Sequence, residues 1–200
     1  MPRFIRTPLA TVVMLAGTRS LGAQALGPQR QFLAIEPYYE RTTLDVGENV
    51  AKRNLNGYGA RLWINLEPFH LIPHGSIALY GTWSPKQSDA GVGNLSTRTL
   101  GAEYDQFFVG RPLGGIVDPF LSVGYSRYKI RSYSTAGALL SKTSYNGLPV
   151  GGGIRIPMPN RFELRVDAKD LILFNTPSGT AGAKRTTNNL LLQGGLGLTF

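Results

Sequence analysis

Ten charged residues fall on alternate positions of extended segments, and the chemistry they could perform is that of ion pairs. Glu163, Arg165, Asp167 and Lys169 form the clearest run. Successive side chains of a strand point to opposite faces, so these four share one face. The other members of the set are Glu36, Glu40, Arg61, Glu103, Asp105 and Arg155. Such a face can hold a hydrogen-bonded ion-pair network, with Glu163 paired to Arg165 or Arg61 paired to Glu103 and Asp105. It can also line a path for protons or ions.

A second candidate is the pair His74 and Ser76, in which a base and a hydroxyl lie two residues apart. A serine nucleophile needs such a base and a third group that orients it, and no orienting carboxylate is obvious here. His70 and His74 are spaced for metal binding on a helix, but Pro68 and Pro73 disfavour a helix. We therefore interpret His74 as a turn residue and expect neither a metal site nor a cofactor.

The elements that position these charges are predicted to be β-strands. Apolar residues recur with a period of two, as in Leu190, Leu192, Leu196, Leu198 and Phe200 near the end of the chain. Strict alternation of this kind indicates a strand with one apolar face. The sequence shows eight such segments, at 32–40, 58–66, 76–83, 100–108, 120–126, 148–156, 162–169 and 190–200.

Within these segments, each of the ten charged residues lies on the face opposite the apolar one. A soluble barrel would have the reverse polarity, with an apolar interior and a charged exterior. A cation on the lipid face of a membrane barrel costs about 2–4 kcal/mol at mid-bilayer, which explains the absence of charge there. We therefore expect the ten residues to plug the interior of a barrel in a membrane, with Trp63 as an uncharged filler.

The connections between the segments alternate in composition. Links rich in Pro or Gly occur around 68–73, 110–118 and 157–160, whereas longer polar links occur around 42–56, 84–97, 129–147 and 170–189. Short turns on one side and long loops on the other are typical of outer-membrane barrels. The predicted fold is all-β: an eight-stranded antiparallel transmembrane β-barrel, an up-and-down meander with short periplasmic turns, long outer loops and both mature termini in the periplasm.

The first 25 residues have the pattern of a secretory signal peptide. Arg3 and Arg6 precede an apolar run from Leu9 to Ala16, and small residues end the segment at Ala23–Ala25. This run is too short to span a bilayer. We expect cleavage after Ala25 and a barrel domain over 26–200. The chain has no cysteine, which excludes disulfide scaffolds and thiolate chemistry. With 42% apolar and only 16% charged residues, it is too hydrophobic for a disordered chain.

The final segment, which ends in alternating apolar residues and Phe200, resembles the last strand of bacterial outer-membrane barrels. The chain after residue 25 resembles the small eight-stranded OmpA/OmpX-like superfamily. This resemblance implies a location in the bacterial outer membrane. It also implies that the barrel-assembly machinery reads Leu196, Leu198 and Phe200 as a signal.

Two groups of residues are expected at the membrane interfaces. Aromatic residues near the ends of the apolar faces should form interfacial girdles: Tyr39, Tyr58, Trp83 and Tyr125 at the outer side, and Phe108 and Phe200 at the inner side. Basic residues outnumber acidic ones in the outer links. Arg41, Arg98, Arg127 and, more weakly, Lys129 lie just beyond the apolar band, where they could bind lipopolysaccharide phosphates or form a solvated basic rim. The basic charge of an exported barrel does not indicate a nucleic-acid partner.

The sequence therefore predicts a structural or surface-interaction protein of the outer membrane, without enzymatic activity, associated with lipid and lipopolysaccharide. One alternative is a narrow ion or small-solute channel along the charged face. Another is a lipid-modifying enzyme, because some outer-membrane lipid hydrolases use a His-x-Ser arrangement. The 129–147 link and the apolar segment 171–174 are candidate contact sites for partners.

Overall fold

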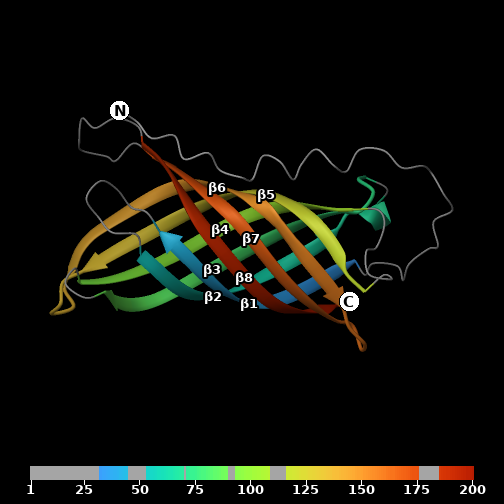
Figure 1. Cartoon of the computed structure of the whole chain (residues 1–200), viewed down its shortest axis with the longest axis horizontal. Coiled ribbons are helices and arrows are strands. Elements are labelled where there is room, and N and C mark those ends of the chain that lie inside the picture. The colour runs from blue at the N-terminus through green and yellow to red at the C-terminus, as the bar shows by residue number, and fades with distance from the viewer. Residues whose placement is uncertain (1–31, 45–52, 70, 90–92, 109–115, 176–184) are drawn as a thin grey trace.

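The computed structural model shows a closed antiparallel barrel (Figure 1). It describes residues 32–44, 53–69, 71–89, 93–108, 116–175 and 185–200. These residues form the strands β1 (Leu33–Leu44), β2 (Arg53–Asn65), β3 (Gly75–Asp89), β4 (Gly93–Phe107), β5 (Asp118–Tyr133), β6 (Leu139–Pro157), β7 (Phe162–Asn175) and β8 (Arg185–Thr199), with one short 3-10 turn, η3 (Glu67–Phe69). No helix in this part of the chain is long and apolar enough to cross a membrane.

Each strand pairs with the next in the chain, and the last pairs with the first. The seam between β8 and β1 runs from Ala34 opposite Thr199 to Thr43 opposite Leu190. Beyond it, the Phe200 amide donates to the Leu33 carbonyl at 2.7 Å. We call the end at which β1, β3, β5 and β7 finish the outer end, on the left of Figure 1, and the opposite end, near Phe200, the inner end. The predicted eight-stranded meander is confirmed.

The two faces of the sheet have opposite polarity over most of its height. Lumen-facing positions carry buried polar and charged side chains, including Glu36, Arg61 and Asp105, each at most 2% exposed. Outward positions carry exposed apolar side chains, such as Leu79 and Leu100, at 57% and 72%. The direction predicted for the charged residues is therefore correct.

Toward the outer end the lumen becomes largely apolar, with Arg53 also buried opposite Leu44. A cluster of buried side chains, which we call the outer apolar layer, fills it: Leu44, Leu55, Leu95, Tyr128, Ile130, Leu171, Leu173 and Leu191, with Tyr145 packed against them. Polar side chains lie outside at the same level, for example Asn54 and Lys129, which are exposed. This end therefore has the polarity of a water-soluble barrel. Leu171 and Leu173 are core residues, which corrects their interpretation as partner contacts.

The strands also extend well beyond the predicted segments. The link predicted at 129–147 is mostly strand, because β5 and β6 continue to Tyr133 and from Leu139. The inner links, 66–74, 108–117 and 158–161, are not consistently shorter than the outer ones, 45–52, 90–92, 134–138 and 176–184. Part of the sequence predicted as long outer loops is therefore strand that continues beyond the apolar band. The polarity changes at the outer end, where polar residues that point outward made strand look like loop.

Two tyrosines lie across glycines inside the barrel. Tyr38 is opposite Gly59, and Tyr80 is opposite Gly101. A Cβ at Gly101 would lie 2.6 Å from the Tyr80 ring and 2.7 Å from the Tyr125 carbonyl oxygen. These glycines leave the space that the rings occupy, so the lumen is filled without widening the barrel.

Candidate functional site: the lumen network and the outer basic surface

Arg61 is the centre of the ion-pair network in the lumen. Its guanidinium nitrogens lie 2.9 Å from Glu36 Oε1, 3.3 Å from Glu103 Oε1 and 3.5 Å from Asp167 Oδ2. It also donates to the Gln193 side chain. The guanidinium carbon lies 4.2 Å from the centre of the Tyr38 ring. Through these contacts Arg61, which lies on β2, connects its own strand to β1, β4, β7 and β8 across the lumen.

Arg165 and Lys169 complete the network on the β7 side. Arg165 Nη1 contacts Asp105 Oδ2 at 2.5 Å, and its Nη2 contacts Asp167 Oδ2 at 3.0 Å. Lys169 Nζ lies 2.5 Å from Glu103 Oε2 and 3.2 Å from Asp167 Oδ2. The Arg165 guanidinium is also held against two rings, 4.2 Å from Trp63 and 3.9 Å from Phe120. Arg61, Arg165 and Lys169 therefore each have at least two carboxylate partners.

A smaller group lies nearer the inner end. Arg155 Nη2 is 3.0 Å from Asp118 Oδ2, and its Nη1 is 3.5 Å from Glu163 Oε2. Its guanidinium carbon lies 4.2 Å from the centre of the Phe107 ring. The Arg155 side chain is 13% exposed, more than the other lumen cations. This group combines charge and aromatic surface in the part of the lumen nearest the inner end.

Glu40 differs from the other carboxylates because it is held by neutral donors. Its Oε1 accepts a hydrogen bond from Thr42 at 3.0 Å, and its Oε2 accepts from Thr82 at 3.3 Å and from Gln193 at 2.6 Å. Among the residues that the structure describes, no ion pair links Glu40 to a base. It lies between the ion-pair network and the outer apolar layer.

All ten charged residues predicted to face inward do so, but their pairing differs in part from the pairs that the sequence suggested. Arg61 contacts Glu103 as suggested, whereas Asp105 pairs with Arg165, and Glu163 pairs with Arg155. Sequence spacing gives the face of a side chain but not its partner across the lumen. The participants that were missed include Gln193, Asp118 and Tyr38. Trp63, expected as a filler, is buried and donates to Glu36 at 2.9 Å.

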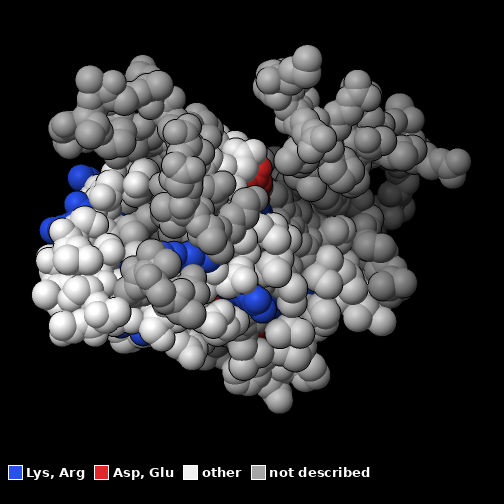
Figure 2. All heavy atoms as spheres, turned by 60° about the vertical axis from the view of Figure 1, so that its left-hand side comes forward, with Lys and Arg blue, Asp and Glu red and all other residues white. Residues whose placement is uncertain are grey.

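A basic surface covers the outside of β4, β5 and β6 at the outer end. The strand register forms three rows on this face: Ser96–Arg131–Lys142, Arg98–Lys129–Ser144 and Leu100–Arg127–Asn146. Five of these nine positions are cationic and none is acidic. Figure 2, which brings the outer end forward, shows more Lys and Arg than Asp and Glu on the described surface.

Like charges lie directly opposite each other within this basic surface. Arg98 is the cross-strand partner of Lys129, and Arg131 is the partner of Lys142. Such pairs destabilise a sheet unless an anion lies between them. At its edge, Lys86 Nζ lies 4.0 Å from the centre of the Tyr133 ring. Hydrogen bonds from Ser96 and Arg131, together with these positive charges, lower the pKa of Tyr133 from its usual value. The directly opposed cations make this surface a candidate site for a group with several negative charges.

The four predicted phosphate ligands do not lie together. Arg98, Arg127 and Lys129 belong to the basic surface, whereas Arg41 lies on β1, opposite Asn56 on one side and Leu192 on the other. All four are exposed and point outward. Arg131 and Lys142, which the sequence reasoning counted as loop charges, are missing members of the surface. Both residues occupy alternate positions that point away from the lumen. This pattern can be recognised only when the strands are known to extend this far.

The aromatic residues predicted for the girdles all face outward. Tyr39, Tyr58, Trp83 and Tyr125 are 43–61% exposed, and Phe108 and Phe200 are 38% and 50% exposed. Tyr39 is opposite Tyr58, with ring centres 5.7 Å apart, and Tyr58 is opposite Trp83. These three form one aromatic row across β1, β2 and β3.

The residues weighed for catalysis and metal binding have separate surroundings. His74 lies in the turn before β3 with a φ of 58°, and its Nδ1 lies 3.8 Å from Glu67 Oε1. Ser76 is buried on β3, opposite Asn65 and Asp105. Within the described ranges, no group of three or more His, Asp or Glu is arranged to hold a metal ion. His70 and the predicted signal peptide, 1–25, lie outside those ranges.

The comparisons with known proteins identify the fold. No family model matches the chain, and no curated protein does. Among solved structures, the chain is similar to Neisserial surface protein A, with a TM-score of 0.62 and 13% identity over 84% of this chain and 96% of that one. It is similar to the N-terminal β-barrel domain of Pseudomonas aeruginosa OprF, with a TM-score of 0.55 and 12% identity over 86% and 98%. The attachment invasion locus protein Ail of Yersinia pestis gives 0.54 and 12% over 86% and 99%.

Proposed function

We propose that this protein is an integral β-barrel of the bacterial outer membrane, with a closed lumen and a structural or surface-interaction role. The observation that supports the membrane location is the polarity of the barrel wall. Between the outer and inner ends, the outside of the wall is apolar and the lumen side is ionic. Exposed apolar side chains such as Leu79 and Leu100 are favourable on a wall that faces hydrocarbon. The carboxylates are kept away from that hydrocarbon in the lumen, where cations pair with them. The structural neighbours, which share the fold, are consistent with this location.

Two layers of different chemistry support the proposal of a closed lumen. The ion-pair network occupies the middle, and the outer apolar layer lies above it. An eight-stranded barrel leaves an interior just wide enough for side chains to fill. A channel would need a wet path past Leu44, Tyr128 and Leu191, each at most 3% exposed. This argues against the channel alternative.

We also propose that the basic surface binds phosphate groups of lipopolysaccharide through Arg98, Arg127, Lys129, Arg131 and Lys142. Arginine binds phosphate with two parallel hydrogen bonds, and an anion relieves the repulsion between directly opposed cations. This is the observation that carries the interaction role. As a related case, Ail of Yersinia pestis has been solved in complex with the heparin analogue sucrose octasulfate, a polyanion.

The test is the affinity of the refolded barrel for purified lipopolysaccharide at two salt concentrations. The triple variant Arg98→Gln, Lys129→Gln, Arg131→Gln should bind at least about tenfold more weakly, with a shallower salt dependence, because fewer phosphates are neutralised. Arg161→Gln is the matched control, because Arg161 is exposed in the link between β7 and β6 at the inner end. Equal affinity in the triple variant and the control would reject the proposal.

Three further assignments belong to this proposal: cleavage after Ala25, termini in the periplasm, and reading of Leu196, Leu198 and Phe200 by the assembly machinery. In support, Leu196 and Leu198 are exposed on β8, the strand that closes the barrel, and Phe200 directly after it is also exposed. Proteolysis of intact cells followed by mass-spectrometric mapping tests the topology. Cleavage in the 134–138 hairpin, with protection of the 158–161 link, is the expected result.

The lipid-modifying enzyme alternative has little support in the geometry. Ser76 lies in the lumen near the inner end, whereas the lipid it would act on lies around the outer half of the barrel. A change in lipid A detected by mass spectrometry, lost in Ser76→Ala, would favour that alternative.

A further inference from the structure

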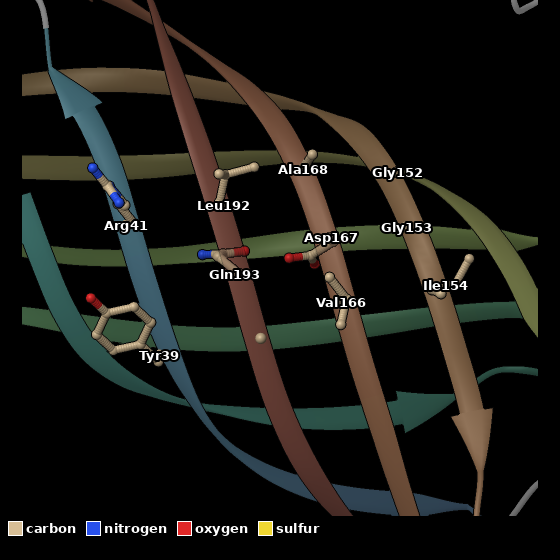
Figure 3. Close-up of a pocket in the computed structure, with 11 residues that line it drawn as sticks. Tyr39, Arg41, Gly152, Gly153, Ile154, Val166, Asp167, Ala168, Leu192 and Gln193 are labelled. Atoms are coloured by element: carbon tan, nitrogen blue, oxygen red, sulfur yellow. The ribbon is translucent and has the colours of Figure 1, made fainter. Parts of the chain in front are cut away.

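A depression of about 540 Å³ lies on the outside of the barrel wall, across β6, β7, β8 and β1 (Figure 3). Two rows of cross-strand partners form it: Gly152–Ala168–Leu192–Arg41 and Ile154–Val166–Gly194–Tyr39. Figure 3 shows Ala168 and Val166 on β7 between Leu192 on β8 and Ile154 on β6. The depression is therefore part of the surface that we assign to the lipid side, and it is separate from the basic surface.

Small residues create the depression, and apolar side chains bound it. Gly152, Ala168 and Gly194 form the floor, and Ile154, Val166 and Leu192 rise around them. A Cβ added at Gly194 would meet nothing within 4 Å, so the space outside this glycine is open. A flexible hydrocarbon chain gains more contact in such a hollow than on a flat wall, because dispersion contacts form on three sides.

Arg41 provides a cation at the side of this depression that is nearest the outer end of the barrel. Arg41 lies nearer the outer end of β1 than Tyr39, and Figure 3 shows both side chains beside the depression. Arg41 is exposed, and within the described part of the chain no carboxylate lies within salt-bridge distance of it. Arg41 therefore has hydrogen-bond donors available for an anion directly beyond the apolar hollow.

We propose that this depression binds one acyl chain of a phosphate-bearing lipid, with the lipid phosphate on Arg41. The proposal rests on the membrane location proposed above. The apolar part of the depression lies toward the inner end of the barrel, and the single cation lies toward the outer end. This arrangement matches a lipid whose headgroup is at the outer interface. Charge complementarity at Arg41 favours this occupant over a second copy of the barrel, whose outward face carries arginine at the same position.

The test uses the barrel refolded in maltoside micelles and titrated with dimyristoyl phosphatidic acid, with bound lipid counted by native mass spectrometry. Ala168→Leu fills the floor of the depression. Ala60→Leu is the matched control, because Ala60 is an exposed, outward-facing alanine on β2. Arg41→Gln removes the cation and leaves the hollow. Insertion of every variant into dimyristoyl phosphatidylcholine vesicles, followed by the gel shift of the folded barrel, is measured in parallel.

We expect one saturable lipid on the wild-type barrel and on Ala60→Leu, and binding at least about tenfold weaker for Ala168→Leu, as expected when two chain methylenes lose their contacts. Arg41→Gln should lose the preference for phosphatidic acid over phosphatidylcholine. Equal binding by Ala168→Leu and Ala60→Leu would overturn the proposal. So would displacement of the lipid by inorganic phosphate, or a dimer that Ala168→Leu dissociates without changing lipid binding.

The vesicle experiment separates the two proposals. Insertion of the barrel together with unchanged lipid binding by Ala168→Leu would reject the depression as a lipid site and leave the membrane location intact. Failure of the wild-type chain to insert would reject both.

Discussion

Replacement of Arg61 by Met tests the ion-pair network most sharply. The change removes three ion-pair contacts, to Glu36, Glu103 and Asp167. Glu103 keeps Lys169 and Arg165, and Asp167 keeps the same two cations. Glu36 loses its ion-pair partner among the described residues and keeps the hydrogen bond from Trp63. The cost is therefore dominated by one stranded, fully buried carboxylate.

Stranding a buried charge in this way lowers the free energy of unfolding by about 3–5 kcal/mol. If Glu36 is the source, adding Glu36→Gln to Arg61→Met should recover most of the loss, because the unpaired charge disappears. Arg127→Met, an exposed cation outside the barrel, should stay within about 0.5 kcal/mol of the wild type.

The assay is urea unfolding of the barrel in short-chain phosphatidylcholine vesicles, followed by tryptophan fluorescence and by the gel shift of the folded form. Unfolding and refolding curves must coincide for the free energies to be valid. A loss below about 1 kcal/mol for Arg61→Met, or no recovery on adding Glu36→Gln, would show that the network does not stabilise the barrel as described.

Three further predictions concern the lumen. Gly101→Ala should reduce the folded fraction strongly, because the new Cβ meets the Tyr80 ring at 2.6 Å, whereas Gly194→Ala should fold normally; gel-shift assays that show equal folding would contradict this. Glu40→Gln should change the free energy of unfolding by less than about 1 kcal/mol, because neutral donors hold this carboxyl, and a loss as large as that of Arg61→Met in the same urea assay would show a missing cation. Planar-bilayer recordings should show no discrete current steps for the wild type or for Arg61→Met, because the outer apolar layer lies above the network; steps altered by changes at Arg61, Glu103 or Arg155 would support a channel.

The sequence predicts the strands of this barrel well wherever one face is apolar and the other charged. The run from Glu163 to Lys169 is an example, because a one-residue error would place charge on the outside. The prediction fails at the outer end. There Tyr128 and Ile130 point inward while Lys129 and Arg131 point outward. This alternation is equally regular but has the opposite polarity. A rule that looks for an apolar outward face therefore assigns these strand residues to a loop.

The site is predictable in its chemistry but not in its pairings. Parity placed Arg165 and Glu163 on the same face, yet they bind different partners because the barrel brings Asp105 of β4 and Arg155 of β6 nearer to them. The basic surface required the register of three strands, which places Arg98 against Lys129 and Arg131 against Lys142. No pattern within a single segment contains that information.

The central claim is that hydrocarbon surrounds the wall while polar side chains fill its centre, and the chain's two tryptophans allow a direct test. Trp83 faces outward and is 53% exposed, whereas Trp63 is 6% exposed in the lumen. The measurement is fluorescence quenching by bromine-labelled acyl chains for Trp63→Phe and Trp83→Phe in phosphatidylcholine vesicles. Strong quenching when Trp83 alone remains, and weak quenching when Trp63 alone remains, is the predicted result. Equal quenching of both, or stronger quenching of Trp63, would contradict the membrane assignment.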